Sequence, residues 1–313
     1  MAKILITGGA GFIGSHLATR FLQGNHTLRV LDNLSTGNKA NLRHVEGKFE
    51  WMEGDIRNAD DCRRACDGME FVYHEAALGS VPKSVEEPLP SHDVNMNGTF
   101  NVLNASLKAG VRRVIYAASS SAYGDVEESP KHEGIKPRPM SPYAVQKLAS
   151  EEYARVFFEC YGLETISLRY FNVFGPRQDP MSQYAAAIPA FVCAILKGEP
   201  PIVYGDGEQS RDFTYIDDVV EGNLLAMKAT KTSGEVVNVA RGDRITVNQV
   251  IAAVNRALGK DVKARHVPPR AGDVRHSCAD VSLSRSLLGF QPRVTFDEGL
   301  RRTIDYYRSL GTS

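Results

Sequence analysis

The sequence has no excess of charge of either sign. Lysine plus arginine and aspartate plus glutamate both number 37 among its 313 residues, so the formal net charge is zero. Proteins that bind nucleic acid or anionic membranes through their surface need a basic patch or stripe. We therefore expect no nucleic-acid partner, and we expect local charges to meet any anionic ligand.

Cysteine pairs and histidine clusters are also missing. The five cysteines include no Cys-x-x-Cys pair, and an odd number argues against a framework of disulfides. The eight histidines include no His-x-x-x-His pair of the kind that binds zinc. We expect no metal.

Long hydrophobic runs are absent as well. The most apolar helical stretch, residues 184–196, is too short to span a bilayer and contains Pro189. A strand is expected from Lys3, which leaves no room before it for a cleavable signal segment. We expect no membrane contact and a cytoplasmic location.

What the sequence does contain is an alternation of short apolar runs and amphipathic stretches. Strands are expected at residues 4–7, 28–31, 49–53, 71–74, 114–117 and 165–169. This pattern favours right-handed crossovers and an α/β fold with a doubly wound parallel sheet of the Rossmann type. After Gly175-Pro176 the rhythm changes to shorter strands, near Ile202, Phe213, Val237 and Lys263. We expect two domains, 1–175 and a smaller mixed α/β domain 176–313, with a ligand cleft at their junction.

A glycine-rich turn follows the first expected strand. Gly8, Gly11 and Gly14 have the spacing that gives a tight turn, a close approach to a pyrophosphate and close helix packing. The helix that begins near Phe12 would point its N-terminal amides at the phosphates. Asp32 ends the second strand about 20 residues on, where its carboxylate can bind a ribose 2′-hydroxyl and would repel a 2′-phosphate. The pattern predicts a site for NAD rather than NADP.

A phenol and an ammonium share one helix face further along the chain. Tyr143 and Lys147 are four residues apart on the helix that Ser141-Pro142 begins. A nearby lysine cation favours the phenolate and lowers the pKa of the phenol, so such a tyrosine can act as a base. By itself the pair is also typical of an exposed helix surface. Ser119 follows the fifth strand and adds a hydroxyl at the carboxyl edge of the sheet.

Together these features have the order and spacing of the short-chain dehydrogenases/reductases. The sequence resembles the extended branch of that superfamily, the nucleotide-sugar epimerases and dehydratases, along essentially its whole length. The resemblance is carried by Thr7-Gly8-Gly9-Ala10-Gly11-Phe12-Ile13-Gly14, Asp32-Asn33, Gly54-Asp55-Ile56, His74-Glu75-Ala76-Ala77, Asn95-Met96-Asn97-Gly98-Thr99, Tyr143 with Lys147, and Arg169-Tyr170-Phe171-Asn172-Val173-Phe174-Gly175-Pro176. Within the branch it is most similar to UDP-hexose 4-epimerases, particularly those for N-acetylated sugars, which share Ala77-Leu78-Gly79-Ser80-Val81-Pro82, Asp179-Pro180, Tyr184-Ala185-Ala186 and Arg275-His276-Ser277.

The resemblance implies a set of site residues in each expected domain. In the first, NAD-binding domain the cofactor residues would be Gly8, Gly11, Phe12, Ile13, Gly14, Asp32, Asn33, Asp55, Ile56, Ala76, Ala77, Asn95, Tyr143, Lys147 and Tyr170, with Asp55 and Ile56 at the adenine. Substrate contacts, many of them in the second, nucleotide-sugar-binding domain, would be Ser80, Ser121, Asn172, Tyr204, Arg211, Arg270, Asp273 and Ser277. Asn172, Arg211 and Arg270 would hold the substrate diphosphate, since guanidinium forks suit a pyrophosphate.

The implied activity is epimerisation of a UDP-hexose at C4 through a transient 4-keto sugar. Tyr143 would be the base, Ser119 would donate a hydrogen bond to the reacting oxygen, and Lys147 would hold the nicotinamide ribose. UDP-N-acetylglucosamine and UDP-N-acetylgalactosamine are the expected pair, because a small Ser277 at the sugar would leave room for an acetamido group. UDP-glucose and UDP-glucuronate 4-epimerases remain alternatives.

Other classes fit less well. Related 4,6-dehydratases place Thr-Asp-Glu, and UDP-glucuronate decarboxylases tend to place a glutamate, where this chain has Ser119-Ser120-Ser121. A non-catalytic NAD-binding sensor would not need Ser119, Tyr143 and Lys147 together. The resemblance also implies a homodimer built from the helices after Pro90 and Pro142, with apolar positions at Val102, Ala105, Ala109, Ala149, Tyr153 and Val156. The alternative is that these apolar faces are internal and pack on the sheet.

Overall fold

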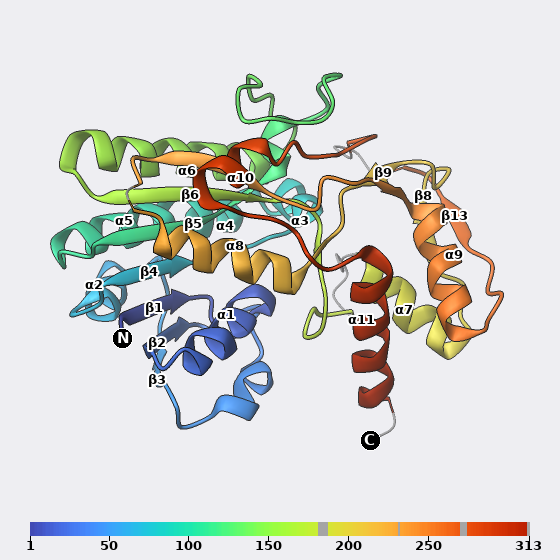
Figure 1. Ribbon diagram of the computed structural model, residues 1–313, viewed down its shortest axis with the longest axis horizontal. Coiled ribbons are helices and arrows are strands. Elements are labelled where there is room, and N and C mark those ends of the chain that lie inside the picture. The colour runs from blue at the N-terminus through green and yellow to red at the C-terminus, as the bar shows by residue number, and fades with distance from the viewer. Residues whose placement is uncertain (181–186, 231, 270–273, 312–313) are drawn as a thin grey trace.

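A seven-stranded parallel sheet lies at the centre of the molecule, in a computed structural model that describes residues 1–180, 187–230, 232–269 and 274–311 (Figure 1). The strand order is β11-β6-β5-β4-β1-β2-β3, and every neighbouring pair is parallel. The strands are β1 (Lys3–Thr7), β2 (Thr27–Asp32), β3 (Glu50–Glu53), β4 (Phe71–His74), β5 (Arg113–Ser119), β6 (Glu164–Tyr170) and β11 (Glu235–Val239). The six strands predicted for the first half are all present, so the predicted α/β fold with a parallel Rossmann-type sheet is confirmed.

Strand order reverses beside β1. The chain runs from β1 outward to β2 and β3, and then returns to place β4, β5 and β6 on the other side of β1. Such a reversal opens a crevice at the carboxyl ends of the strands, where α/β sheets bind ligands. The buried strands support this geometry, because Ile4, Leu5 and Ile6 are fully enclosed between the two helical layers.

Helices cover both faces of the sheet. One layer contains α2 (Ala59–Cys66), α5 (Thr99–Lys108) and α6 (Pro142–Tyr161), and the other contains α1 (Phe12–Gln23) and α8 (Ile216–Lys228). Helix α6 begins where the Ser141 side chain accepts a hydrogen bond from the Ala144 backbone N–H, with Pro142 at the first helical position, and it ends at Gly162, whose φ is 74°. Short helical segments join the main elements: η1 (Lys39–Val45), α3 (Val81–Glu86), α4 (Pro88–His92), η2 (Asp93–Gly98) and η3 (Ser120–Tyr123).

Smaller elements follow β6. The paired short strands are β7 (Val173–Phe174) with β10 (Thr214–Tyr215), β9 (Ser210–Arg211) with β12 (Ile245–Thr246), and β8 (Ile202–Tyr204) with β13 (Arg265–Val267). The remaining helices are α7 (Ala187–Lys197), α9 (Val247–Leu258), α10 (Ser282–Leu288) and α11 (Phe296–Leu310). Helices α7, α9 and α11 pack together on the right of Figure 1.

One predicted strand belongs elsewhere. The strand near Val237 was expected in the second domain, but it is β11 of the main sheet, where Val237 pairs with Leu168 of β6. Helix α8 likewise packs on the main sheet. The local apolar run predicts a strand but not its neighbour, and the edge beside β6 offers backbone partners and a buried face. A division of the chain after residue 175 therefore does not separate two sets of packed elements, because β11 and α8 follow that residue but belong to the main sheet and its helical layer.

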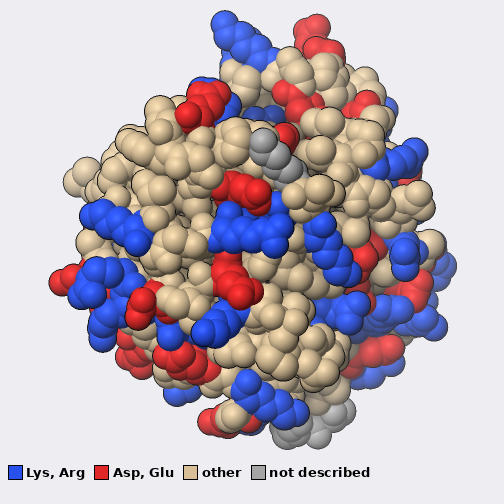
Figure 2. All heavy atoms as spheres, turned by 60° about the vertical axis from the view of Figure 1, so that its left-hand side comes forward, with Lys and Arg blue, Asp and Glu red and all other residues tan. Residues whose placement is uncertain are grey.

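The surface carries mixed charge, in keeping with the composition. On the face shown in Figure 2, lysine and arginine side chains are interspersed with aspartate and glutamate. Among the helices that the structure describes, none combines the length and apolar character needed to cross a membrane.

Candidate active site

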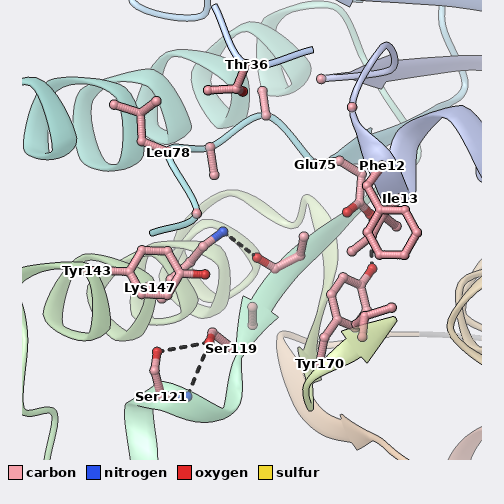
Figure 3. A pocket seen from close by; sticks show the side chains of 18 of the residues that line it. Phe12, Ile13, Thr36, Glu75, Leu78, Ser119, Ser121, Tyr143, Lys147 and Tyr170 are labelled. Atoms are coloured by element: carbon pink, nitrogen blue, oxygen red, sulfur yellow. Dashed lines mark hydrogen bonds between the residues drawn. The ribbon is translucent and has the colours of Figure 1, made fainter. Parts of the chain in front are cut away.

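A pocket of about 590 Å³ lies at the carboxyl ends of the central strands (Figure 3). Its wall includes the glycine turn and Asp32 from the first half of the chain, and Arg211 and Ser277 from the second. The crevice expected from the sheet reversal is thus a real cavity, and both halves of the chain build it.

The glycine turn forms a cradle at one side of this pocket. Gly8 has a φ of 69°, and a Cβ there would lie 2.7 Å from the Cα of Ala76. A Cβ on Gly14 would lie 2.7 Å from the Cα of Gly9, so the start of α1 can approach the turn only without a side chain. Gly11 is the N-cap of α1, and no side chain in the described part of the chain caps that helix. The first amides of α1 are therefore suited to an anionic diphosphate.

Two carboxylates line the pocket beyond the cradle. Asp32 accepts hydrogen bonds from the backbone N–H groups of Ala10, at 2.9 Å, and Leu34, at 2.8 Å. Burial raises the pKa of Asp32, and these two hydrogen bonds oppose the rise. Asp55 accepts from Arg57 at 2.7 Å and from Asn33 at 2.8 Å, and the Arg57 hydrogen bond lowers the pKa of Asp55 to about 2.

The other predicted cofactor residues, with one exception, lie on the same wall. They are Phe12, Ile13, Asn33, Ile56, Ala76, Ala77 and Tyr170. The exception is Asn95, which is 2 % exposed and does not contribute to the pocket wall. Its side chain accepts from the Leu78 backbone N–H at 2.9 Å and donates to Gln146 Oε1 at 2.8 Å. Asn95 therefore holds the loop that follows Ala77 instead of lining the pocket itself.

Ser119, Tyr143 and Lys147 come together where β5 ends and α6 begins (Figure 3). Ser119 Oγ accepts hydrogen bonds from the Ser121 backbone N–H at 3.2 Å and from Ser121 Oγ at 2.9 Å. Because its acceptor positions are occupied, the Ser119 hydroxyl is left to donate its own proton. The Lys147 ammonium donates to the Ala117 carbonyl oxygen at 2.7 Å and lies 5.9 Å from the centre of the Tyr143 ring.

The electrostatics of this group differ from the expectation. Burial raises the pKa of Tyr143, and a hydrogen bond with Ser119 opposes the rise. The sequence predicted a pKa lowered by Lys147, but burial of the phenol is the largest influence and raises the pKa instead. Burial also lowers the pKa of Lys147 to about 8, with Glu75 and Glu151 opposing.

Glu75 is a pocket residue that the sequence reasoning did not assign. It follows β4, and its carboxylate accepts a hydrogen bond from the Tyr170 hydroxyl at 3.0 Å. Burial raises the pKa of Glu75 to about 7, while the Tyr170 hydrogen bond and the Lys147 charge oppose the rise. The available signal was its place directly after a buried strand that neighbours the sheet reversal.

The predicted substrate residues are divided among several places. Ser121, Asn172, Arg211 and Ser277 line the pocket together, and Lys131, which was not predicted, joins them. Ser80 instead caps α3 by accepting from the Lys83 backbone N–H at 3.2 Å, and it lines a neighbouring cavity. Tyr204 lies on β8, outside the pocket wall, and Arg270 and Asp273 lie outside the described residues. Within the described ranges, no group of three His, Cys, Asp or Glu side chains is arranged to hold a metal ion.

Comparisons with known proteins agree with this geometry. Residues 4–240 match the model of the NAD-dependent epimerase/dehydratase family. A putative UDP-glucose 4-epimerase from Methanocaldococcus jannaschii is 37% identical over 308 residues, covering 98% of each chain.

Two solved structures are similar over almost their whole length. The UDP-N-acetylglucosamine 4-epimerase from Methanobrevibacter ruminantium, in complex with UDP-N-acetylmuramic acid, is 38% identical, with a TM-score of 0.94 and 99% of both chains covered. The UDP-glucuronic acid 4-epimerase from Bacillus cereus, in complex with UDP-glucuronic acid and NAD, is 31% identical, with a TM-score of 0.92 and coverage of 98% of this chain and 99% of that one.

Proposed function

The chain belongs to the NAD-dependent epimerase/dehydratase family, and we propose that it is a UDP-sugar 4-epimerase that interconverts UDP-N-acetylglucosamine and UDP-N-acetylgalactosamine and also accepts UDP-glucose and UDP-galactose. The observation that carries the proposal is that Ser119, Tyr143 and Lys147 share one pocket with the glycine cradle and Asp32. A proton acceptor and a dinucleotide site are therefore in reach of one bound sugar.

The residues of the cradle fit NAD. The open N-terminus of α1 would hold the diphosphate, and the Asp32 carboxylate would accept from the adenosine ribose and repel a 2′-phosphate. Asp55, ionised because of Arg57, would lie with Ile56 at the adenine. When bound, NAD supplies the acceptor for the hydrogen on C4 of the sugar and later its donor.

The protein's part in the chemistry is proton transfer at the sugar 4-oxygen. Tyr143 Oη takes the proton of the 4-hydroxyl, and the Ser119 hydroxyl, whose acceptor positions Ser121 occupies, donates a hydrogen bond to the same oxygen. Lys147 would hold the nicotinamide ribose, and its ammonium, 5.9 Å from the centre of the Tyr143 ring, would favour the phenolate over the neutral phenol.

Inversion at C4 requires the keto sugar to present its other face. Asn172 and Arg211 line the pocket and would hold the diphosphate while the sugar turns. The turn of Ser119, Ser120 and Ser121 contains no carboxylate, so it lacks the acid and base for eliminating water. This favours return of the hydrogen to C4 over dehydration.

One observation favours UDP-glucuronate as a second candidate substrate. Lys131 lines the pocket together with Ser277 and Arg211, and its ammonium donates to the Val126 carbonyl oxygen. Burial lowers the pKa of Lys131, so pairing with a substrate carboxylate would stabilise its charged form. Ser277, a small residue on the same wall, supports the N-acetylated sugars.

A panel of UDP-sugars distinguishes these substrates. The purified protein is incubated separately with UDP-N-acetylglucosamine, UDP-glucose and UDP-glucuronate, and the products are separated by chromatography. Conversion of the first, with a higher kcat/KM than for the other two, supports the proposal. Conversion of UDP-glucuronate alone assigns the second function.

We also propose a homodimer, through the outer faces of α5 and α6. Phe100 is 42% exposed, and its ring lies 5.6 Å from that of Tyr153, which is 40% exposed. This face differs from the predicted one in part: Tyr153 belongs to both, whereas Val102 and Ala105 are buried in the monomer core. Exposed aromatic rings on adjacent helices are typical of a surface that a second copy covers.

A further inference from the structure

A carboxylate lies beside the catalytic group without taking part in the proton transfer described above. Glu75 lines the pocket, and among the described residues the Tyr170 hydroxyl is the one donor that hydrogen-bonds to its carboxylate. Tyr170 in turn accepts from Asn223 Nδ2 at 2.9 Å, and that amide also donates to the Val219 carbonyl oxygen at 2.9 Å. This chain of hydrogen bonds, from α8 through β6, fixes the Glu75 carboxylate in place.

The position of Glu75 along the pocket gives it a specific neighbour. Asp32 and Asp55 mark the adenosine end, whereas Tyr143 and Lys147 mark the end where the sugar reacts. Glu75 belongs to the reacting end, because its hydrogen-bond partner Tyr170 is paired with Ser119 in the register of β5 and β6. The charges of Glu75 and Lys147 also act on each other. Figure 3 shows the Glu75 carboxyl meeting the Tyr170 hydroxyl beside Phe12 and Ile13, at the start of α1.

We propose that Glu75 is an electrostatic determinant of the cofactor state, which favours the oxidised nicotinamide over the reduced one. The oxidised ring carries a positive charge, and the reduced ring carries none. A fixed carboxylate at that end of the pocket attracts the positively charged oxidised ring and has no net charge to attract on the reduced ring. Glu75 thereby opposes accumulation of the reduced cofactor when a keto sugar escapes.

The pH dependence follows from the groups around Glu75. Lys147 of α6, Tyr170 of β6 and Tyr73 of the preceding strand β4 are the titratable groups that interact with Glu75. Helix α1 presents the uncharged Phe12 and Ile13, and α8 contributes the neutral Asn223. Burial raises the pKa of Glu75 to about 7, so the carboxylate forms as the pH rises through that value. The affinity for NAD⁺ relative to that for NADH should therefore gain little from Glu75 at acidic pH, where the carboxyl is protonated, and gain most at alkaline pH, where it is ionised.

Equilibrium exchange of bound NAD⁺ against NADH, followed by NADH fluorescence at a series of pH values, tests the proposal. In Glu75→Gln the ratio of affinities for NAD⁺ and NADH should match the wild type in acid and fall at least about tenfold below it in alkali, as one lost charge at effective dielectric ~20 implies. Lys147, whose pKa is about 8, is deprotonated in both the wild type and Glu75→Gln at the most alkaline pH of the series. Its titration therefore does not create the expected difference in the affinity ratio. Glu199→Gln, an exposed residue outside the pocket, is the matched control and should follow the wild type throughout.

A second variant keeps the test open if Glu75→Gln does not fold. Tyr170→Phe removes the hydrogen bond that lowers the pKa of Glu75, so the rise in the affinity ratio should move to higher pH. An alkaline ratio for Glu75→Gln equal to the wild type, an equal offset at both ends of the pH range, or an unmoved profile for Tyr170→Phe would overturn the proposal. The inference rests on the nicotinamide lying beside Tyr143, but no sugar is present, so failure here is separate from failure of the epimerase assignment.

Discussion

The Lys147 ammonium is anchored 2.7 Å from the Ala117 carbonyl oxygen, which ties the second turn of α6 to β5. Strand β5 carries Ser119 at its end, and α6 carries Tyr143 one turn before Lys147. This single hydrogen bond therefore fixes the relative placement of the three groups that the proposed reaction needs. Lys147→Ala should harm turnover through both the cofactor contact and the lost charge.

Removal of the proposed base is the first test of the chemistry. Tyr143→Phe leaves the ring and removes the hydroxyl, so the rate should fall about 10²–10⁴-fold, the usual contribution of a positioned proton-transfer group. Steady-state kinetics and circular dichroism measure rate and fold together. Tyr161→Phe, on the exposed end of the same helix, serves as the control and should keep full activity. A loss below about tenfold for Tyr143→Phe would place the base elsewhere.

Cofactor choice depends on Asp32. Asp32→Asn keeps an acceptor at the end of β2 but removes the charge that would repel a 2′-phosphate. The preference for NAD over NADP should fall by at least about tenfold, since hydrogen bonds to charged groups contribute roughly 1.5–3 kcal/mol. Dissociation constants for both cofactors, measured by fluorescence, check this. Unchanged preference would show that another residue selects the cofactor.

Sugar choice depends on the space beside Ser277. A tyrosine at this position would fill the volume proposed for the acetamido group, and overpacking costs about 1–3 kcal/mol, or roughly 5- to 150-fold. The ratio of kcat/KM for UDP-N-acetylglucosamine to that for UDP-glucose should fall by this factor in Ser277→Tyr. Ser286→Tyr, exposed on α10, controls for the added ring. A constant ratio would remove Ser277 from the sugar site.

Stability behind the site rests on a buried ion pair. Arg169 of β6 and Glu151 of α6 are 2.7 Å apart, and both are almost completely buried. Glu151→Ala leaves the guanidinium charge without its partner and should lower the free energy of unfolding by about 3–5 kcal/mol. Glu152→Ala, which breaks an exposed pair with Arg155, should cost at most about 1 kcal/mol. Denaturant titrations that give similar losses for the two variants would contradict this assignment.

Association is tested at the aromatic face of α5 and α6. Sedimentation should show a dimer at micromolar concentration, and Tyr153→Glu should shift it toward monomer, because it places charge among the exposed rings of Phe100 and Tyr153. A monomeric wild type would rule out the proposed interface.

Local pattern was sufficient to predict much of the molecule. The buried strands around Ile4 and Ile115 and the turn at Gly8 are specified by neighbouring residues, and they appear as predicted. Ser119, Tyr143 and Lys147 also share a pocket, because β5 ends at Ser119 and α6 packs on that strand, with Lys147 donating to the Ala117 carbonyl oxygen.

What the sequence did not predict depends on contacts between distant segments. The partner of β11 is β6, about seventy residues earlier, and nothing in the apolar run around Val237 specifies it. Asn95 and Glu75 were both within motifs of the resemblance, yet only the folded chain shows that one turns inward to Gln146 and the other meets Tyr170. The pKa of Tyr143 follows from burial, which sequence spacing does not report.

The most direct test is incubation of the purified protein with UDP-N-acetylglucosamine, without added cofactor. The account predicts UDP-N-acetylgalactosamine as the product, approaching the same equilibrium mixture from either sugar, with NAD released when the protein is denatured. A folded, NAD-loaded protein that forms no 4-epimer from any UDP-hexose would contradict it.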